Sequence, residues 1–278
     1  MIRRELPDVE MLASGFGVPE APLWDEQGGL YFSDVRHGGV YHLRRGEVEC
    51  VLPGRTSGGM LLHTAGGLVL TGDNLAHFRD GDLRLLAEVP GPSWAIFNDL
   101  TADDDGSVLV GTLRWRPHKD EPPRPGELWR VQAGGRMDRL YGDVDASNGM
   151  VRVGDTFVHA DTVRRQLIVH NVAGRRFSDR RVIELGELGQ PDGMAVDTDG
   201  GVWVALFNGG GICRVRGQLI DRVITMPARR VTNLCFGGPG LRDLFVLASD
   251  NQLDPSRRGT IFRIRLGITG RPVPKASI

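Results

Sequence analysis

Short apolar runs of strand length recur along the chain, each preceded by a turn rich in Gly or Asp and bounded by turn residues. A second run of strand length follows most of them, so each pair predicts a β-hairpin. The first runs lie at 29–34, 67–72, 106–111, 155–160, 201–206 and 242–247, and their partners at 39–43, 75–78, 126–131, 166–170, 211–215 and 259–264.

The spacing of these units predicts the fold. Successive first runs start 38 to 49 residues apart, close to the period of about 40–45 residues of a four-stranded propeller blade. Isolated hairpins would leave open sheet edges, whereas radial closure leaves only short, protected ones. We therefore expect an all-β fold, a six-bladed β-propeller with four-stranded antiparallel blades around a central channel, in which the N-terminal segment closes the ring.

Composition agrees with this fold class and excludes others. The 278 residues include 39 glycines and 16 prolines, too many for a helical bundle, and 40% of them are hydrophobic, too many for a disordered chain. No stretch approaches the roughly 18–20 unbroken apolar residues of a membrane helix. Closed β architectures often run long and no Ser/Pro linker separates two halves, so we expect one domain over 1–278.

The charge balance points to a small partner. The 34 basic and 35 acidic residues nearly cancel, so no global field would hold nucleic acid or an anionic membrane. We expect a small-molecule substrate and a monomer or weak homo-oligomer. Paired arginines at 175–176, 180–181 and 229–230 are interpreted as solvated surface. No signal segment opens the chain, and three cysteines lack metal-ligand spacing, which favours the reducing cytoplasm: Cys50, Cys213 and Cys235.

About eight residues before each first run, where an inner strand should reach the channel, five of the six positions offer a side-chain oxygen. These positions hold Glu20, Gly58, Asn98, Asn148, Asp192 and Asn233. Asn-Asp, Asn-Gly and Asp-Gly often only make turns, but their recurrence at equivalent positions, together with a Glu that no turn requires, favours a shared site. Carboxylate and amide oxygens without Cys or His suit a hard cation. The sequence predicts one divalent cation, with calcium preferred and magnesium, manganese or zinc as alternatives.

Four motifs in this order give the chain a resemblance to a known family. They are the run from Glu20 to Trp24, Asn98-Asp99 with Gly111-Thr112 downstream, Ser147-Asn148-Gly149, and the run from Pro191 to Asp197 with Trp203-Val204-Ala205. From about residue 14 to about residue 265 the chain resembles the senescence marker protein, regucalcin and gluconolactonase family. The resemblance implies a six-bladed lactonase whose divalent ion is held by Glu20, Asn148 and Asp192, with Asn98 nearby as a ligand or substrate contact.

The implied chemistry is metal-assisted hydrolysis. A divalent ion polarises the lactone carbonyl, stabilises the developing oxyanion and lowers the pKa of a bound water. We expect Asp192 to accept the proton of the attacking water. The alternative is that Asp192 only binds the metal, because a cation reduces the basicity of a carboxylate that it binds.

Two positions depart from the members of the resembled family that hydrolyse sugar lactones. Those relatives have an Arg two residues before the blade-three Asn and an acidic residue about four after the Gly-Thr pair, whereas this chain has Ile96 and Arg116. Trp94, Met60, Phe97, Trp115 and Phe207 are expected near the channel mouth with Ile96 and predict an apolar pocket, in which Arg116 could meet a substrate carboxylate. The candidate substrate-binding residues are Asn98, Ile96, Arg116, Trp115, Met60 and Phe207. The expected substrate is a lactone or small ester less hydroxylated than a sugar lactone, with an acidic one as a variant.

Three classes of function remain open. The leading hypothesis is a metal-dependent lactonase or esterase; the second is an isomerase or other non-hydrolytic enzyme using the same ion; the third is a non-catalytic module that binds a ligand. Neither Ser57 nor Ser147 lies in a Gly-x-Ser-x-Gly motif, which disfavours a serine hydrolase. The Pro-rich segment 117–125 is either a lid or a plain surface loop. Trp24 and Trp203 are interpreted as core aromatics.

Overall fold

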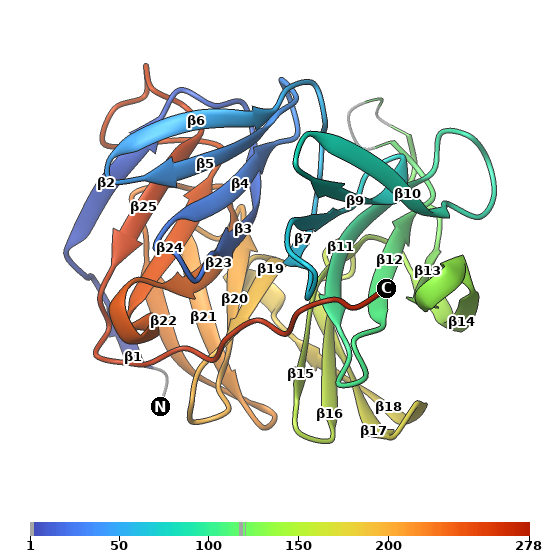
Figure 1. The fold of residues 1–278 in the computed structure, drawn as a ribbon. Helices are drawn as coiled ribbons and strands as arrows, with labels where there is room; N and C mark the ends of the chain where they lie inside the picture. The colour runs from blue at the N-terminus through green and yellow to red at the C-terminus, as the bar shows by residue number, and fades with distance from the viewer. Residues whose placement is uncertain (1–2, 117–118, 120) are drawn as a thin grey trace.

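Six sheets are arranged radially around one channel in the part of the chain that the computed structural model describes, residues 3–116, 119 and 121–278 (Figure 1). In blades 1 to 3 the strands are β3 (Pro19–Trp24), β4 (Leu30–Asp34), β5 (Val40–Arg44) and β6 (Glu47–Leu52); β7 (Met60–Leu62), β8 (Leu68–Leu70), β9 (Asn74–Arg79) and β10 (Asp82–Glu88); and β11 (Ile96–Ala102), β12 (Val108–Leu113), β13 (Gly126–Val131) and β14 (Met137–Val144).

Blades 4 to 6 repeat the same order from the channel outward. Their strands are β15 (Ser147–Val153), β16 (Thr156–Asp161), β17 (Gln166–Ala173) and β18 (Arg176–Glu184); β19 (Gln190–Val196), β20 (Val202–Phe207), β21 (Gly211–Arg216) and β22 (Leu219–Thr225); and β23 (Val231–Gly237), β24 (Asp243–Ala248), β25 (Thr260–Ile264) and β2 (Val9–Ser14). Short 3-10 turns lie at η2 (Ala133–Gly135), η3 (Gly186–Leu188) and η4 (Pro239–Leu241).

The N-terminal segment closes the ring. Strand β2 pairs with β25 and supplies the outermost strand of blade 6, so the first and last parts of the chain share one sheet. The preceding strand β1 (Arg3–Glu5) pairs in parallel with β22 at the edge of blade 5. The six-bladed fold and its N-terminal closure are therefore confirmed. No helix in the described residues is long and apolar enough to cross a membrane.

Apolar side chains fill the spaces between neighbouring blades. Among the described residues they form six clusters, one between each pair of neighbours. Middle strands are thus covered on both faces, and every residue of β12 and β24 is buried. This explains why the first runs of the sequence are continuously apolar. Trp203 is fully buried and Trp24 stacks on Phe245 with ring centroids 5.2 Å apart, which confirms both as core aromatics.

Asp and Gly recur in the sequence because one turn recurs in the structure. In blades 1 and 5 the Oδ1 atoms of Asp25 and Asp197 accept hydrogen bonds of 2.8 Å from the backbone N–H of Gly29 and Gly201. The other oxygen of Asp197 accepts a hydrogen bond of 2.7 Å from Arg214 Nε on the third strand. A Cβ atom at Gly201 would lie 2.2 Å from that Nε, so the turn excludes a side chain there.

The innermost strands lose their ladder register at one level. In blades 3, 4 and 5 the residue pairs 98–99, 148–149 and 192–193 have no ladder partner, and blade 1 shifts register just after Glu20. Blade 6 shifts just before Asn233. Such bulges re-aim side chains and increase the local twist. The register shifts fall at or next to the polar positions that the sequence analysis predicted to face the channel.

A C-terminal strap, residues 271–278, crosses the channel at the end where the innermost strands finish (Figure 1, dark red trace). The N–H of Arg271 donates to Val196 O of blade 5 at 2.8 Å, and the N–H of Ala276 donates to Leu62 O of blade 2 at 2.9 Å. Ala276 is fully buried in the cluster between blades 2 and 3. The strap therefore links opposite blades and covers this end of the channel.

Replacing Ala276 with Gln should destabilise the propeller. Ala276 has no exposed surface, and an amide buried without a partner costs about 1–3 kcal/mol. Since a loss of 1 kcal/mol lowers the Tm of a chain of this size by roughly 2–4 °C, we expect Tm to fall by about 4–10 °C in thermal unfolding followed by circular dichroism.

Lys275→Gln is the matched control, because it introduces the same side chain one residue earlier. Lys275 Nζ lies 2.8 Å from Glu26 Oε1 in a surface ion pair, and such pairs contribute only about 0–1 kcal/mol. Equal losses of Tm in the two variants would contradict the packed strap.

Candidate metal and substrate site

Hydrogen bonds join the polar residues at the bulge level into two pairs, each of which links neighbouring blades. Asn233 Nδ2 donates a hydrogen bond of 3.1 Å to Glu20 Oε2, which links blade 6 to blade 1. Asn98 Nδ2 donates to Asn148 Oδ1 at 3.2 Å and to Ser147 O at 2.9 Å, which links blade 3 to blade 4. The structure thus brings together side chains that lie up to 213 positions apart in the sequence.

Glycines make room for this group. A Cβ atom at Gly193 would lie 1.8 Å from Asn233 Oδ1, and one at Gly58 would lie 2.5 Å from Asn98 Oδ1. Each of these glycines therefore gives space to the polar side chain of the next blade. Gly58, the aligned position without a side-chain oxygen, is needed for the placement of Asn98.

Thr162 fixes the orientation of Asn148, and sequence reasoning missed it. The hydroxyl of Thr162 donates to Pro191 O at 2.7 Å and accepts a hydrogen bond of 3.1 Å from Asn148 Nδ2. Because the nitrogen of the amide is held by Thr162, its oxygen is left for the channel side, where it also meets Asn98. No sequence signal beyond its place after β16 marked this threonine.

Three carboxyl groups lie close enough to influence one another: the buried Asp99 and Asp192 and the partly buried Glu20. Burial, and then the charge of Asp99, raises the pKa of Glu20. Burial, and then the charges of Glu20 and Asp99, raises the pKa of Asp192 well above its usual range. Burial raises the pKa of Asp99 to about 7. Negative charge in this group is therefore poorly compensated by the protein.

Asp192 has one oxygen without a hydrogen-bond partner. Its Oδ1 is buried and unpaired among the described residues, and buried polar atoms are rarely left so. Within residues 3–116, 119 and 121–278 no three His, Cys, Asp or Glu side chains form a ready-made metal-binding cluster. A cation site here would therefore depend on amide oxygens as well as on carboxylates.

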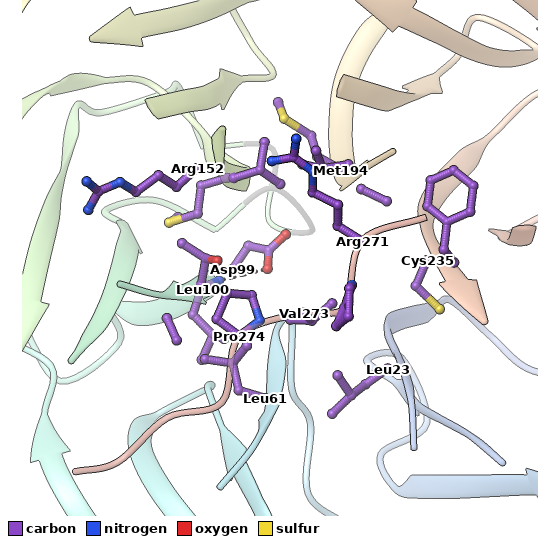
Figure 2. A pocket seen from close by; sticks show the side chains of 18 of the residues that line it. Leu23, Leu61, Asp99, Leu100, Arg152, Met194, Cys235, Arg271, Val273 and Pro274 are labelled. Carbon is purple, nitrogen blue, oxygen red and sulfur yellow. Dashed lines mark hydrogen bonds between the residues drawn. The ribbon is translucent and has the colours of Figure 1, made fainter. Parts of the chain in front are cut away.

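Asp99 is a second residue that sequence reasoning passed over. It occupies the position after Asn98, where other blades have Gly59, Gly149 and Gly193. Its carboxyl group points into a chamber of about 380 Å³ in the half of the channel that the strap covers, here called the lower half (Figure 2). The strap forms the floor of this chamber with Arg271, Val273 and Pro274. The Asn98-Asp99 dipeptide could have marked Asp99 as a site residue, but only Asn98 was predicted to be one.

The residues expected at the channel mouth divide into two groups. Ile96, Trp115 and Phe207 lie partly buried at strand ends on the side where the innermost strands begin. Met60 instead lines the lower chamber, because it follows the Gly58-Gly59 pair and so lies below the bulge level. Phe97 is fully buried between blades 2 and 3, so its expected place at the mouth was wrong.

Arg116 already contacts other side chains of the protein through its guanidinium group. Its Nε donates to Glu121 Oε1 at 2.8 Å, and its guanidinium lies 5.4 Å from the centre of the Trp94 ring. The expectation that Arg116 meets a substrate carboxylate would require this pair to open. Of the segment 117–125, proposed as a lid or surface loop, Pro117, His118 and Asp120 lie outside the described residues.

A buried histidine supports the strand that carries Asn148. His159 Nε2 lies 2.7 Å from Ser147 Oγ, and His159 Nδ1 lies 2.7 Å from Tyr141 Oη. Ser147 and His159 have no exposed surface, so this Ser-His pair is structural. Burial lowers the pKa of His159 to about 3, with His170 and Arg180 adding repulsion.

Comparison with known proteins relates the chain to lactonases. The family model described as SMP-30/Gluconolactonase/LRE-like region matches residues 18–250. A 6-deoxy-6-sulfogluconolactonase of Pseudomonas putida is 31% identical over 281 residues, with 92% of this chain and 93% of the relative covered. The pentonolactonase XacC of Haloferax volcanii is 28% identical over 276 residues, covering 91% and 92%. The solved structure of a calcium-binding protein, regucalcin, from Agrobacterium tumefaciens has a TM-score of 0.88 at 20% identity over 100% of both chains, which shows the fold alone.

Replacing His159 with Gln should flatten the dependence of stability on pH. The unfolded histidine takes up a proton near its ordinary pKa of about 6.5, whereas the folded one stays neutral down to about 3. The unfolded state therefore binds more protons in this window, and the folded state loses stability as the pH falls through it. One such proton is worth at most about 1.4 kcal/mol per pH unit, and urea unfolding across the window should show this slope missing in the variant.

Phe157→Leu is the control for general loss of packing. Phe157 is fully buried, its ring centroid lies 6.1 Å from that of His159, and it does not titrate, so this variant should lose stability without changing the slope. A His159→Gln variant with the slope of the parent protein would contradict the neutral buried histidine.

Proposed function

The chain belongs to the SMP-30/gluconolactonase/LRE-like family, and from this membership we propose that it hydrolyses a lactone or small ester with the help of one divalent cation. The observation that carries the proposal is the group of Glu20, Asn148 and Asp192 held at one level of the channel. Its support is the similarity, over about nine tenths of the chain, to proteins named as lactonases.

The residues present fit a hard divalent cation. Glu20, Asn148 and Asp192 would hold it, since they offer two carboxylates and an amide oxygen whose nitrogen is already bonded to Thr162. The unpaired Oδ1 of Asp192 is an acceptor in need of a positive partner. Uncompensated buried carboxylates are costly, and a cation would relieve their repulsion. Calcium is our first candidate, ahead of magnesium, manganese and zinc.

When bound, the cation would supply Lewis-acid polarisation of the lactone carbonyl and would acidify a water. Asp192 would accept the proton of the attacking water through the carboxylate oxygen that the cation leaves free. Asn98 would position the substrate: its Nδ2 is used by Ser147 and Asn148, and its Oδ1 lies over Gly58. The strap would keep bulk water from entering through the lower end.

The substrate would be less hydroxylated than a sugar lactone. Ile96 and Phe207 supply apolar surface at strand ends near the mouth, and the side chain of Arg116 is engaged by Glu121 and Trp94. The three cysteines are free thiols, two of them buried, which fits a reducing compartment such as the cytoplasm.

The central experiment strips the protein with a chelator and assays acid release from a panel of sugar, aliphatic and aromatic lactones and small esters. We expect no release without metal and restored release with calcium, magnesium, manganese or zinc, with aliphatic or aromatic lactones ahead of gluconolactone. Metal binding without acid release from any member would favour isomerisation or another non-hydrolytic reaction. Failure to bind any of the four metals would refute the site.

Asp192→Asn separates proton transfer from metal binding. Asn keeps an oxygen ligand but is a poor base, and a general base contributes about 10²–10⁴-fold to rate. We expect kcat at saturating metal to fall at least about 10²-fold, with a weaker metal Kd as a separate effect. If kcat at full metal occupancy is unchanged, Asp192 is a ligand only.

Gly193→Ala should weaken metal binding from outside the ligand set. The added Cβ would lie 1.8 Å from Asn233 Oδ1, so Asn233 must move and release Glu20. Loss of one positioning contact of this kind typically costs about 10–100-fold in metal affinity, which calorimetric titration would measure. Gly142→Ala is the control, since its Cβ meets only the end of the flexible Arg139 side chain. Equal Kd values for both variants would contradict the role of Gly193.

A further inference from the structure

A second cavity opens between blades 1 and 6, on the side where the innermost strands begin. Its volume is about 700 Å³, and Phe16 and Val18 supply apolar surface within it. Four arginines line it, two from the loop before β23 and one each from the loops after β4 and β24: Arg229, Arg230, Arg36 and Arg258. We call them the arginine rim.

The guanidinium groups of the arginine rim have no protein partner. Among residues 3–116, 119 and 121–278, none of the four has a carboxylate within 4.0 Å or a side-chain hydrogen bond. All four residues are exposed. By contrast, Arg114, Arg164 and Arg222 each pair with a carboxylate. The four guanidinium groups are therefore exposed and unpaired among the described residues, which agrees with the solvated surface expected for Arg229 and Arg230 and leaves the groups available to a ligand.

Two carboxylates hold the backbone of the loops that surround the cavity. Asp34 has almost no exposed surface and accepts hydrogen bonds from the backbone N–H groups of Gly17, Val18, Arg36 and His37. Asp250 does the same for the backbone of Arg229 and Arg230, at 3.0 and 2.8 Å. Because these carboxylates bond to backbone rather than to guanidinium groups, they fix the loops and leave the arginine side chains available.

The cavity lies beside the candidate metal site. Thr232 Oγ1 donates to Pro19 O at 2.7 Å, directly before the bond between Asn233 and Glu20. Val18 precedes Glu20 by two residues and Arg230 precedes Asn233 by three. At about 3.3 Å per extended residue, the backbone of Arg230 lies roughly 10 Å from Asn233, the hydrogen-bond partner of Glu20. A five- or six-carbon substrate spans such a distance.

We propose that the arginine rim binds an anionic group, such as a phosphate, sulfonate or carboxylate, carried by the substrate at the end remote from its lactone carbonyl. The inference rests on the proposed function for the position of the carbonyl, and it names the substrate class of that same site. Guanidinium groups recognise such oxyanions by paired, charge-assisted hydrogen bonds. The apolar surface of Phe16 and Val18 would contact the carbon chain between the two ends.

The binding test needs no catalysis. Calorimetric titration compares gluconate with 6-phosphogluconate, two open-chain acids that differ only in the remote phosphate. We expect the phosphate to tighten binding to the parent protein at least about tenfold, since hydrogen bonds to charged groups are strong. The double variant Arg229→Gln/Arg230→Gln should lose this preference, and added salt should weaken it in the parent protein.

Arg180→Gln/Arg181→Gln is the matched control. It removes the same two charges from the exposed edge strand β18 of blade 4, on the opposite side of the ring, and should keep the phosphate preference. A parent protein without preference, or a preference that survives in the Arg229→Gln/Arg230→Gln variant, would overturn the proposal. Inorganic phosphate that binds as tightly as 6-phosphogluconate would also overturn it, in favour of a free anion as the ligand.

The kinetic test addresses the substrate. The same variants are assayed with glucono-1,5-lactone and its 6-phosphate, and we expect the loss of the two arginines to raise KM only for the phosphorylated lactone. Equal changes of KM for the two lactones would contradict a substrate-borne anion. If neither lactone is hydrolysed, and no member of the panel of lactones and esters is hydrolysed either, but the phosphate preference depends on the rim, the proposed hydrolysis fails while the anion site stands.

Discussion

The register shift in the innermost strands is the constraint on which the channel depends. A regular strand would alternate its side chains between the two neighbouring blades, where apolar clusters fill the space. At the bulges the chain leaves this alternation, and Asn98, Asn148 and Asp192 lie in unpaired positions. The same level holds Glu20 and Asn233 next to shifts of register. Polar residues can thus gather at the axis without disturbing the packing between blades.

The shape of the channel gives these residues an unusual environment. The strap covers the lower end, and a chamber lined by Leu61, Met150 and Val273 lies above it. Asp99 extends into this chamber (Figure 2), and both Asp99 and Asp192 are buried, so these two carboxyl groups have little access to water. Low local polarity strengthens both their repulsion and any attraction to a cation. The closed end therefore matters for the chemistry of the upper level and not only for stability.

Sequence reasoning reached the blades and the aligned polar positions because both follow from local rules. Blade period, Gly-Asp turns and continuous apolar runs each have a local cause, as Asp197 and Gly201 illustrate. Contacts between blades have no such signature. Thr162 matters only because its hydroxyl bonds to Asn148 and to Pro191 O, which is 29 positions away. Phe97 lies in the core because residues of the neighbouring blade pack against it. Met60 lines the strap-side chamber and not the channel mouth. The position of a residue along the channel depends on strand register, which tertiary structure sets.

Neither the carboxyl groups at the channel axis nor the guanidinium groups of the arginine rim have an ion-pair partner among the described residues. Buried carboxylates occur at the axis, and unpaired guanidinium groups line the neighbouring cavity between blades 1 and 6. The carboxylates of Asp34 and Asp250 lie near the rim, but they bond to backbone N–H groups and not to its guanidinium groups. An arrangement of this kind orients a dipolar ligand, because exchanging its two ends would place negative charge against Glu20 and Asp192. With a cation at the axis, an anionic lactone would have one favourable orientation, with its carbonyl toward Asp192 and its remote charge toward Arg229 and Arg230.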